Sequence, residues 1–109
     1  MEGYDFDGVV SEGIKPGPND VIITGRTLEE SYFTLQFLKE NNIWCPVFFN
    51  TSEFEYKSTK SSALHKAKVI QLLGIQKFYE DTIEQALIIR EFTPCEVILV
   101  NKEGEKACE

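Results

Sequence analysis

Two aspartates stand at alternate positions in the segment DFDGVV, which covers residues 5–10. Asp5 and Asp7 lie where a short predicted strand gives way to Gly8. Two carboxylates that share a site raise each other's pKa unless a cation or hydrogen-bond donors neutralise them. The pair therefore indicates a metal site or an acid/base pair. A solvated Asx turn is an equally simple interpretation of this hexapeptide taken alone.

Three more polar residues, Thr24, Lys66 and Asp81, occupy positions from which they could reach the same place. Asp5, Thr24 and Asp81 each follow or end a predicted strand, and ligands of an open α/β sheet bind beyond the carboxyl ends of its strands. Lys66 lies in the early turns of a helix that starts at this edge, so its flexible ammonium can extend to it. We therefore expect acids, a hydroxyl and a lysine to converge there.

The elements that must position these residues follow an α/β pattern. Short apolar runs rich in β-branched and aromatic residues alternate with segments of helical spacing, which is typical of a parallel sheet covered by helices. Continuous apolar runs such as 21–23 and 97–100 fit strands that are buried on both faces. The predicted strands are a short one ending near residues 4–6, then 21–24, 46–49, 77–80 and 96–100.

Three helices are predicted between these strands. Thr27 with Glu30 and Thr82 with Gln85 match the capping-box pattern of a helix start, and Gly74 matches a helix stop. The predicted helices run from Thr27 to about Asn41, from about Ser62 to Leu73, and from Thr82 to before Pro94. The apolar side chains expected to face the sheet are Leu28, Tyr32, Leu35, Leu38, Ala63, Ala67, Ile70, Leu73, Ile83, Ala86 and Leu87.

Composition limits the classes of protein. We expect one domain over residues 1–109, with a polar tail from about 103 to 109, because 109 residues are one domain's worth. A net charge of -7 excludes a basic protein that coats a duplex. No apolar run approaches the ~20 residues that cross a bilayer. Three cysteines without a CxxC pair or a secretory signal favour reduced thiols in the cytoplasm, with Cys45 and Cys95 as small buried hydrophobes.

Four segments, taken in order, resemble the motifs of the haloacid dehalogenase-like superfamily of phosphohydrolases. They are DFDGVV, the hydroxyl of IITGR at Thr24, the lysine of HKAKVIQLLG and YED at residues 79–81. One such motif is weak evidence, but four in the family's order on the right kinds of element are much stronger. The resemblance implies a Rossmann-like, three-layer domain with a five-stranded parallel sheet in the order 3-2-1-4-5.

The resemblance also implies roles for the converging residues. Asp5 would be the nucleophile of a magnesium-dependent phosphomonoester hydrolase that forms an aspartyl-phosphate, and Asp7 would be its general acid and base. Magnesium would be held by the Asp5 carboxylate, the Asp7 backbone carbonyl and Asp81. Thr24 would bind a phosphoryl oxygen, while Lys66 would neutralise the transferring group and orient Asp5.

Further contacts to substrate are expected from residues that adjoin the first two motifs. Backbone N–H groups around Phe6 and Gly8 would add to the phosphate cradle, as would Gly25. Arg26 could contact the phosphate or pair with Glu29 or Glu30 on the following helix.

Two assignments stay open within the third and fourth motifs. Lys66 fits the spacing of the third motif better than Lys68 does. Relatives often carry a run of acids in the fourth motif, whereas here Thr82 follows Asp81 and could simply cap a helix. Whether Glu80 or Glu84 assists the metal is left undecided by the sequence.

The chain has no room for the cap domains of larger relatives, so we expect an open site that serves large substrates or uses a neighbouring subunit of a homo-oligomer as its lid. Lysines from 57 to 68, with His65 among them as a surface or hydrogen-bonding residue, form either an anion-attracting rim or an ordinary solvated face. A nucleotide or a phosphorylated nucleic-acid end is the preferred substrate. Phe54 and Tyr56 could stack on a base, although packing against the sheet is favoured.

A non-catalytic protein is the alternative interpretation. A receiver-like signalling module also places acids, a hydroxyl and a lysine at strand ends, but its acceptor aspartate lies on the third strand, which here ends in Asn50. A phosphate- or metal-binding scaffold derived from a phosphatase fits the sequence better. The presence of both Asp5 and Asp7 favours activity over such a scaffold.

Overall fold

Five parallel strands form the sheet of the computed structural model, which describes residues 1–100. The strands are β1 (Gly3–Tyr4), β2 (Val21–Thr27), β3 (Val47–Asn50), β4 (Lys77–Glu80) and β5 (Glu96–Leu99). They are ordered β3-β2-β1-β4-β5, and every neighbouring pair is parallel. The predicted α/β class and strand order are confirmed. The predicted tail at 103–109 and Cys108 lie outside the described residues.

The short strand β1 lies at the centre of the sheet, between β2 and β4. Gly3 is paired with Val21 on one side and with Phe78 on the other. The backbone N–H of Asp5, directly after β1, donates to the carbonyl oxygen of Tyr79 at 2.9 Å. Although β1 has only two residues, pairing on both sides fixes where Asp5 leaves the sheet.

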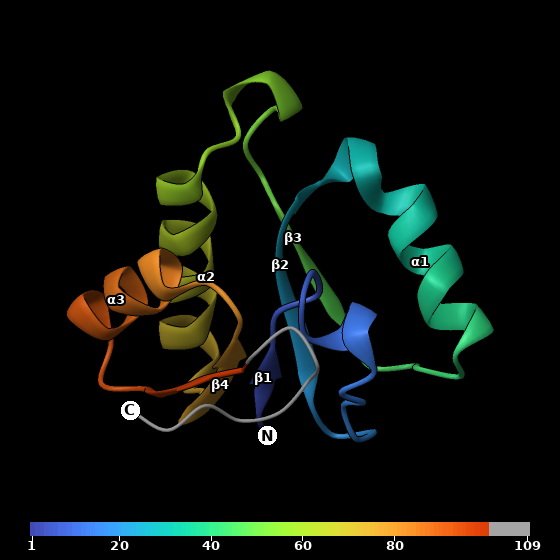
Figure 1. Ribbon diagram of the computed structural model, residues 1–109, viewed down its shortest axis with the longest axis horizontal. Helices are drawn as coiled ribbons and strands as arrows, with labels where there is room; N and C mark the ends of the chain where they lie inside the picture. Colours follow the sequence, from blue (N-terminus) through green and yellow to red (C-terminus); the bar gives the residue numbers. More distant parts are fainter. Residues whose placement is uncertain (101–109) are drawn as a thin grey trace.

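Helices cover both faces of the sheet (Figure 1). The described residues form α1 (Ser31–Glu40), α2 (Thr59–Leu73) and α3 (Ile83–Phe92), together with the 3-10 turns η1 (Val10–Glu12), η2 (Leu28–Glu30) and η3 (Phe54–Tyr56). One core cluster joins the sheet to α1 and contains Phe6, Val10 and Leu38. A second joins it to α2 and α3 and contains Ile70 and Ile89. None of these helices is long and apolar enough to cross a membrane.

Two of the predicted helix starts need correction. The predicted capping box at Thr27 and Glu30 is present, but it opens the 3-10 turn η2, and α1 begins only at Ser31. Helix α2 begins three residues before the predicted Ser62, because Ser58 caps it: the Ser58 hydroxyl accepts from the backbone N–H of Ser61 at 3.0 Å. Its predicted stop is confirmed, since Gly74 has a φ of 67°.

The predicted apolar face of the first helix is mostly wrong. Leu38 is buried as predicted, whereas Leu28, Tyr32 and Leu35 are exposed. The 3-10 turn η2 has about 3.0 residues per turn rather than 3.6, so a helical phase counted from Thr27 does not carry through to α1. The buried stripe of α1 is instead Thr34 and Leu38.

The predicted face is confirmed for α2 except at Leu73, whereas that of α3 is wrong at two of its three residues. Helix α2 buries Ala63, Ala67 and Ile70, while Leu73 at its end is partly exposed. Helix α3 buries Ala86 but exposes Ile83 and Leu87. Its covered stripe is narrow because α3 packs mainly along α2, so side chains of its first turn and of its outer flank remain in solvent.

The loop that joins β3 to α2 also departs from prediction. Phe54 and Tyr56 do not pack against the sheet, since 53% and 70% of their surfaces are exposed. Strand β3 is an edge strand and ends at Asn50, so the turn η3 stands beyond the sheet, above its carboxyl edge (Figure 1). Cys45 and Cys95, in contrast, are buried as expected.

Candidate active site

A cavity of about 170 Å³ opens at the carboxyl edge of the sheet. It is lined by Asp5, Asp7, Gly25, Arg26, Lys57, Ser62, Lys66, Asp81, Thr82 and Gln85. Six of these were candidates from the sequence. Two other candidates, Gly8 and Thr24, are not part of the lining. Ser62 and Gln85 were not among the candidates for the site, because their local pattern assigned them to helix starts.

The ammonium of Lys66 lies at the centre of the polar cluster. Its Nζ atom is 3.0 Å from Oδ1 of Asp5 and 2.8 Å from Oε1 of Glu80. The third contact is with Oε1 of Gln85, at 2.7 Å. An ammonium has three N–H donors, so these contacts account for all of them. Lys66 is 1% exposed, whereas Lys68 lies in solvent, and the cluster therefore contains the preferred lysine.

Glu80 is fully buried and its two oxygens have separate partners. Oε1 accepts from Lys66, while Oε2 accepts from the backbone N–H groups of Asp81 and Thr82, at 3.1 and 3.2 Å. The Thr82 hydroxyl also donates to Oε2, at 2.8 Å. The predicted capping box between Thr82 and Gln85 is therefore absent: Glu80 takes the threonine hydroxyl, and Gln85 faces Lys66. Glu80 holds the turn that leads from β4 to α3.

The pKa values of the cluster reflect burial and crowding of like charges. Burial raises the pKa of Asp5 well above its ordinary value, against the attraction of Lys66 and with a further rise from Glu80. Burial, followed by repulsion from Glu80, raises the pKa of Asp81. Burial alone would raise the pKa of Glu80, but Lys66 and the hydrogen bonds outweigh it and the pKa is lowered. Burial opposes ionisation of Lys66, yet Asp5 and Glu80 raise its pKa.

Three carboxylates in this cluster are suited to a divalent cation. One ligand oxygen from each of Asp5, Glu80 and Asp81 lies within 4.8 Å of the others. The ammonium of Lys66 offsets part of their charge inside the cluster. Magnesium prefers oxygen ligands and keeps several waters, so this donor set fits it. Glu80, whose part in metal binding the sequence left undecided, is in the group, whereas Glu84 is exposed and outside it.

The Asp7 side chain lies apart from the three acids and forms an ion pair with Arg26. Nε and Nη2 of the guanidinium are 3.0 Å from Oδ2 and 2.9 Å from Oδ1 of Asp7. Arg26 also lies over the ring of Phe6, 4.8 Å from its centroid, and donates to the Thr34 hydroxyl. Of the two roles considered for Arg26, the ion pair with Glu29 or Glu30 is not formed, because Asp7 takes that place, and the contact with phosphate stays a prediction. A partner 19 residues away could not be recognised from local spacing.

Thr24 and His65 are held by backbone groups. The hydroxyl of Thr24 is fully buried and accepts from the backbone N–H of Arg26 at 3.0 Å. One ring nitrogen of His65 lies 3.1 Å from the carbonyl oxygen of Phe48, and burial lowers the pKa of the imidazole. His65 is thus a hydrogen-bonding residue, as expected, and does not line the cavity. Of the lysine-rich segment, only Lys57 and Lys66 do so.

Two glycines permit close approach at the cavity. Gly8 has a φ of 80°, and a Cβ atom there would overlap the carboxylate of Asp81. A Cβ atom on Gly25 would overlap the hydroxyl of Ser62.

We expect Gly8→Ala to displace Asp81 and to strain the backbone, since a left-handed φ is costly for residues with a side chain. Its magnesium affinity should fall at least about tenfold, the smallest effect typical of losing support for a metal ligand. Calorimetric titration with magnesium measures this, and Gly13→Ala, at a φ of 106° with open space around it, controls for the strain alone.

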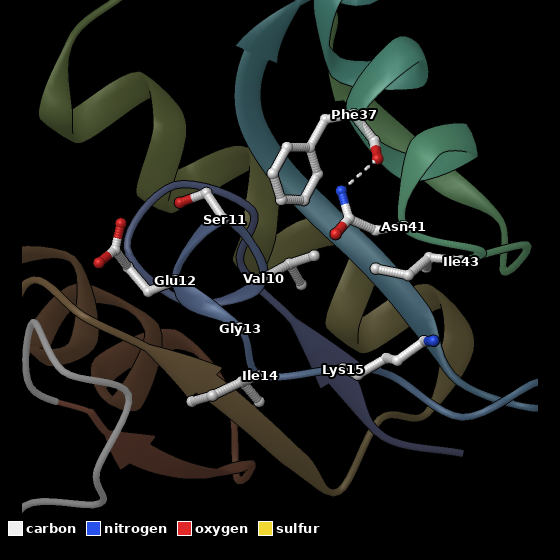
Figure 2. Close-up of a pocket in the computed structure, with 9 residues that line it drawn as sticks. All are labelled: Val10, Ser11, Glu12, Gly13, Ile14, Lys15, Phe37, Asn41 and Ile43. Atoms are coloured by element: carbon white, nitrogen blue, oxygen red, sulfur yellow. Dashed lines mark hydrogen bonds between the residues drawn. The ribbon is translucent and has the colours of Figure 1, made fainter.

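A second cavity, of about 460 Å³, lies on the α1 side of the sheet between the η1 loop and the end of α1 (Figure 2). Its lining includes Glu12 and Lys15 from the loop, and Phe37 and Asn41 from the helix. The Asn41 amide is bonded to the Phe37 carbonyl oxygen, which satisfies the end of α1. None of the acids of the carboxyl-edge cluster lines this cavity, so the predicted chemistry does not belong to it.

Comparisons with protein-family models, with curated proteins and with solved structures gave no match to this chain. Its function is therefore inferred from the side chains at the carboxyl edge. These combine a buried acid beside a lysine, a group of carboxylates that fits a divalent cation, and a second acid fixed by an arginine.

Proposed function

We propose that this chain is a magnesium-dependent phosphomonoester hydrolase that works through an aspartyl-phosphate on Asp5. The observation that supports this best is the position of Asp5, which is buried, 3.0 Å from the Lys66 ammonium, and part of the acid group that fits a cation. The ordered resemblance of four segments to phosphohydrolase motifs agrees with it. A bound magnesium ion would offset the repulsion between an anionic nucleophile and an anionic substrate.

In the first step, an Asp5 carboxylate oxygen attacks phosphorus and the bond from phosphorus to the leaving oxygen breaks. Asp7 is the general acid that gives a proton to that leaving oxygen. Lys66 steadies Asp5 and offsets charge on the transferring group. Because Gln85 holds the third N–H of Lys66, we expect a phosphoryl oxygen to replace the Gln85 contact when substrate binds.

In the second step, water attacks phosphorus and the bond between phosphorus and Asp5 breaks, which releases inorganic phosphate. Asp7 accepts the proton from the attacking water. The Asp7 side chain is 56% exposed at the cavity, so it can meet both a leaving group and water. Arg26 fixes the direction of that carboxylate through two parallel hydrogen bonds, a geometry that planar guanidinium groups favour.

The test is release of phosphate from an aryl phosphate with and without magnesium. We expect turnover with magnesium, loss of turnover on chelation, and recovery when the ion is added back. A protein that binds magnesium and turns over no member of a broad panel of phosphoesters would support the scaffold instead. A receiver-like role is disfavoured because Asn50 is buried and structural: its side chain bonds to the carbonyl oxygen of Gly25 and to the backbone N–H of Ser52.

A further inference from the structure

A groove of about 460 Å³ adjoins the candidate active site on the side of the β3–α2 loop. It is lined by Phe54, Lys57, Ser58, Thr59, Ser62 and Gln85. Lys57, Ser62 and Gln85 also line the smaller cavity, so the two spaces meet. A cavity of about 170 Å³ is below the ~300 to 1,000 Å³ of typical ligand pockets. The rest of a bound phosphoester must therefore extend out of it.

We propose that this groove binds the leaving group of the substrate and that the leaving group is a nucleoside, which makes the substrate a nucleoside monophosphate. The proposal rests on the hydrolase function given above, because it assigns the alcohol part of the same phosphoester. Its basis is the chemistry of the lining: one exposed aromatic ring, one cation, hydroxyl groups and an amide.

The exposed ring of Phe54 is the main feature of the groove. A phenylalanine with 53% of its surface exposed gains little from folding, and its ring offers a flat face to solvent. The Lys57 ammonium lies 6.0 Å from the ring centroid. Aromatic rings stack on nucleobases in a sequence-tolerant way.

The ring is held in place by the η2 turn. The backbone N–H of Phe54 donates to Oε1 of Glu29 at 3.0 Å. Three residues later, Nζ of Lys57 lies 2.9 Å from Oε1 of Glu30. These contacts tie the β3–α2 loop to the start of α1, two segments that stand together above the carboxyl edge (Figure 1). The backbone that carries the ring is thus fixed at the mouth of the site, although the ring is not part of the core.

The rest of the lining suits a sugar. The hydroxyl groups of Thr59 and Ser62 and the amide of Gln85 are the kinds of donor and acceptor that bind ribose hydroxyls. Among residues 1–100, no acidic side chain lines the groove, although the whole chain has a net charge of -7. This overall charge repels long polyanions, which favours a free nucleotide over the end of a nucleic-acid strand.

The experiment compares adenosine 5′-monophosphate with ribose 5-phosphate, which is the same phosphoester without the base. Wild-type protein should have a kcat/KM about tenfold or more higher for the nucleotide, in line with the usual strength of base stacking. Phe54→Ala should bring the ratio close to one. Tyr56→Ala is the matched control: its ring is in the same turn and more exposed but does not line the groove, so the preference should remain.

Equal turnover of the two substrates by wild-type protein would overturn the proposal, as would an equal loss of preference in Tyr56→Ala. A 5′-phosphorylated trinucleotide hydrolysed better than the mononucleotide would reject the free nucleotide as substrate. Binding of adenosine 5′-monophosphate, measured by calorimetry, separates this proposal from the hydrolase itself. Binding that depends on Phe54 without any turnover would support the groove and reject hydrolysis, whereas turnover of ribose 5-phosphate without a base preference would reject only the groove.

Discussion

Asp5→Asn is expected to abolish phosphate release and to leave the fold intact. The amide cannot attack phosphorus, so kcat should fall on the order of 10⁴-fold or more, as it does when a nucleophile is removed. The carbonyl oxygen of asparagine can still accept from the Lys66 ammonium and from the backbone N–H of Phe6, as Oδ1 of the carboxylate does. Phosphate release in a magnesium-containing assay measures the loss.

The same substitution should maintain or raise stability in the absence of metal. Burial raises the pKa of Asp5 above its ordinary 3.8, so its contribution to stability is present below that pH and is lost as the pH rises through the folded-state pKa. Asparagine carries no charge, so the variant does not lose this stability as the pH rises. At neutral pH without magnesium, Asp5→Asn should unfold at the same urea concentration as wild-type protein or at a higher one.

Glu84→Gln is the control for both measurements, because Glu84 is an exposed acid of the first turn of α3 that does not line the cavity. It should keep full activity and wild-type stability. Retained turnover in Asp5→Asn would contradict the aspartyl-phosphate. Unfolding of Asp5→Asn would instead contradict the view that Asp5 is present for chemistry at a cost to stability.

The sheet could be predicted well from the sequence because buried strands carry their signal locally. Residues 77–80 form β4 as predicted, and 96–99 form β5. Apolar runs bounded by turn residues need no knowledge of distant contacts. The carboxyl edge follows from the parallel arrangement, which is why Asp5, Lys66 and Asp81 could be predicted to converge.

The parts that could not be predicted depend on contacts between distant segments. Arg26 pairs with Asp7, which follows the neighbouring strand β1. Besides Asp5, Lys66 contacts Glu80 and Gln85, which lie 14 and 19 residues further along the chain. Local spacing suggested Glu29 or Glu30 as the partner of Arg26, and it suggested no acid besides Asp5 as a partner of Lys66. The start of α2 was missed for a different reason: its capping box uses Ser61 where Glu or Gln is the usual residue.

Glu80 and Asp81 are neighbours in the sequence, yet we expect Glu80 to stabilise the fold and Asp81 to bind the metal. The substitutions Glu80→Gln and Asp81→Asn distinguish these two roles. Glu80 is fully buried, and its oxygens accept from Lys66 and from three donors in the turn after β4. Glutamine has only one acceptor oxygen, so Glu80→Gln leaves buried donors without partners. Breaking a buried ion pair costs about 3 to 5 kcal/mol, and we expect the free energy of unfolding to fall by about that amount.

Asp81→Asn should have the opposite effects, with little change in stability without magnesium and a reduced gain in stability with it. Asp81 is only partly buried, repelled by Glu80, and accounts for one of the three ligand oxygens of the cation group. Without magnesium its substitution should change the free energy of unfolding by less than about 1 kcal/mol, as is usual for positions near the surface. With magnesium, wild-type protein should gain about 2.7 kcal/mol at 100 times the dissociation constant, and Asp81→Asn should gain much less at the same concentration.

Urea unfolding of both variants, with and without magnesium, measures the two effects side by side. If Glu80→Gln is as stable as wild-type protein but gains nothing from magnesium, Glu80 is a metal ligand and its contacts with the turn add little. If Asp81→Asn keeps the full gain from magnesium, the cation does not use that carboxylate. The four hydrogen bonds at Glu80 and the partial exposure of Asp81 lead us to expect neither result. The buried Glu80 holds Lys66 and the turn, while the partly buried Asp81 is available to the ion.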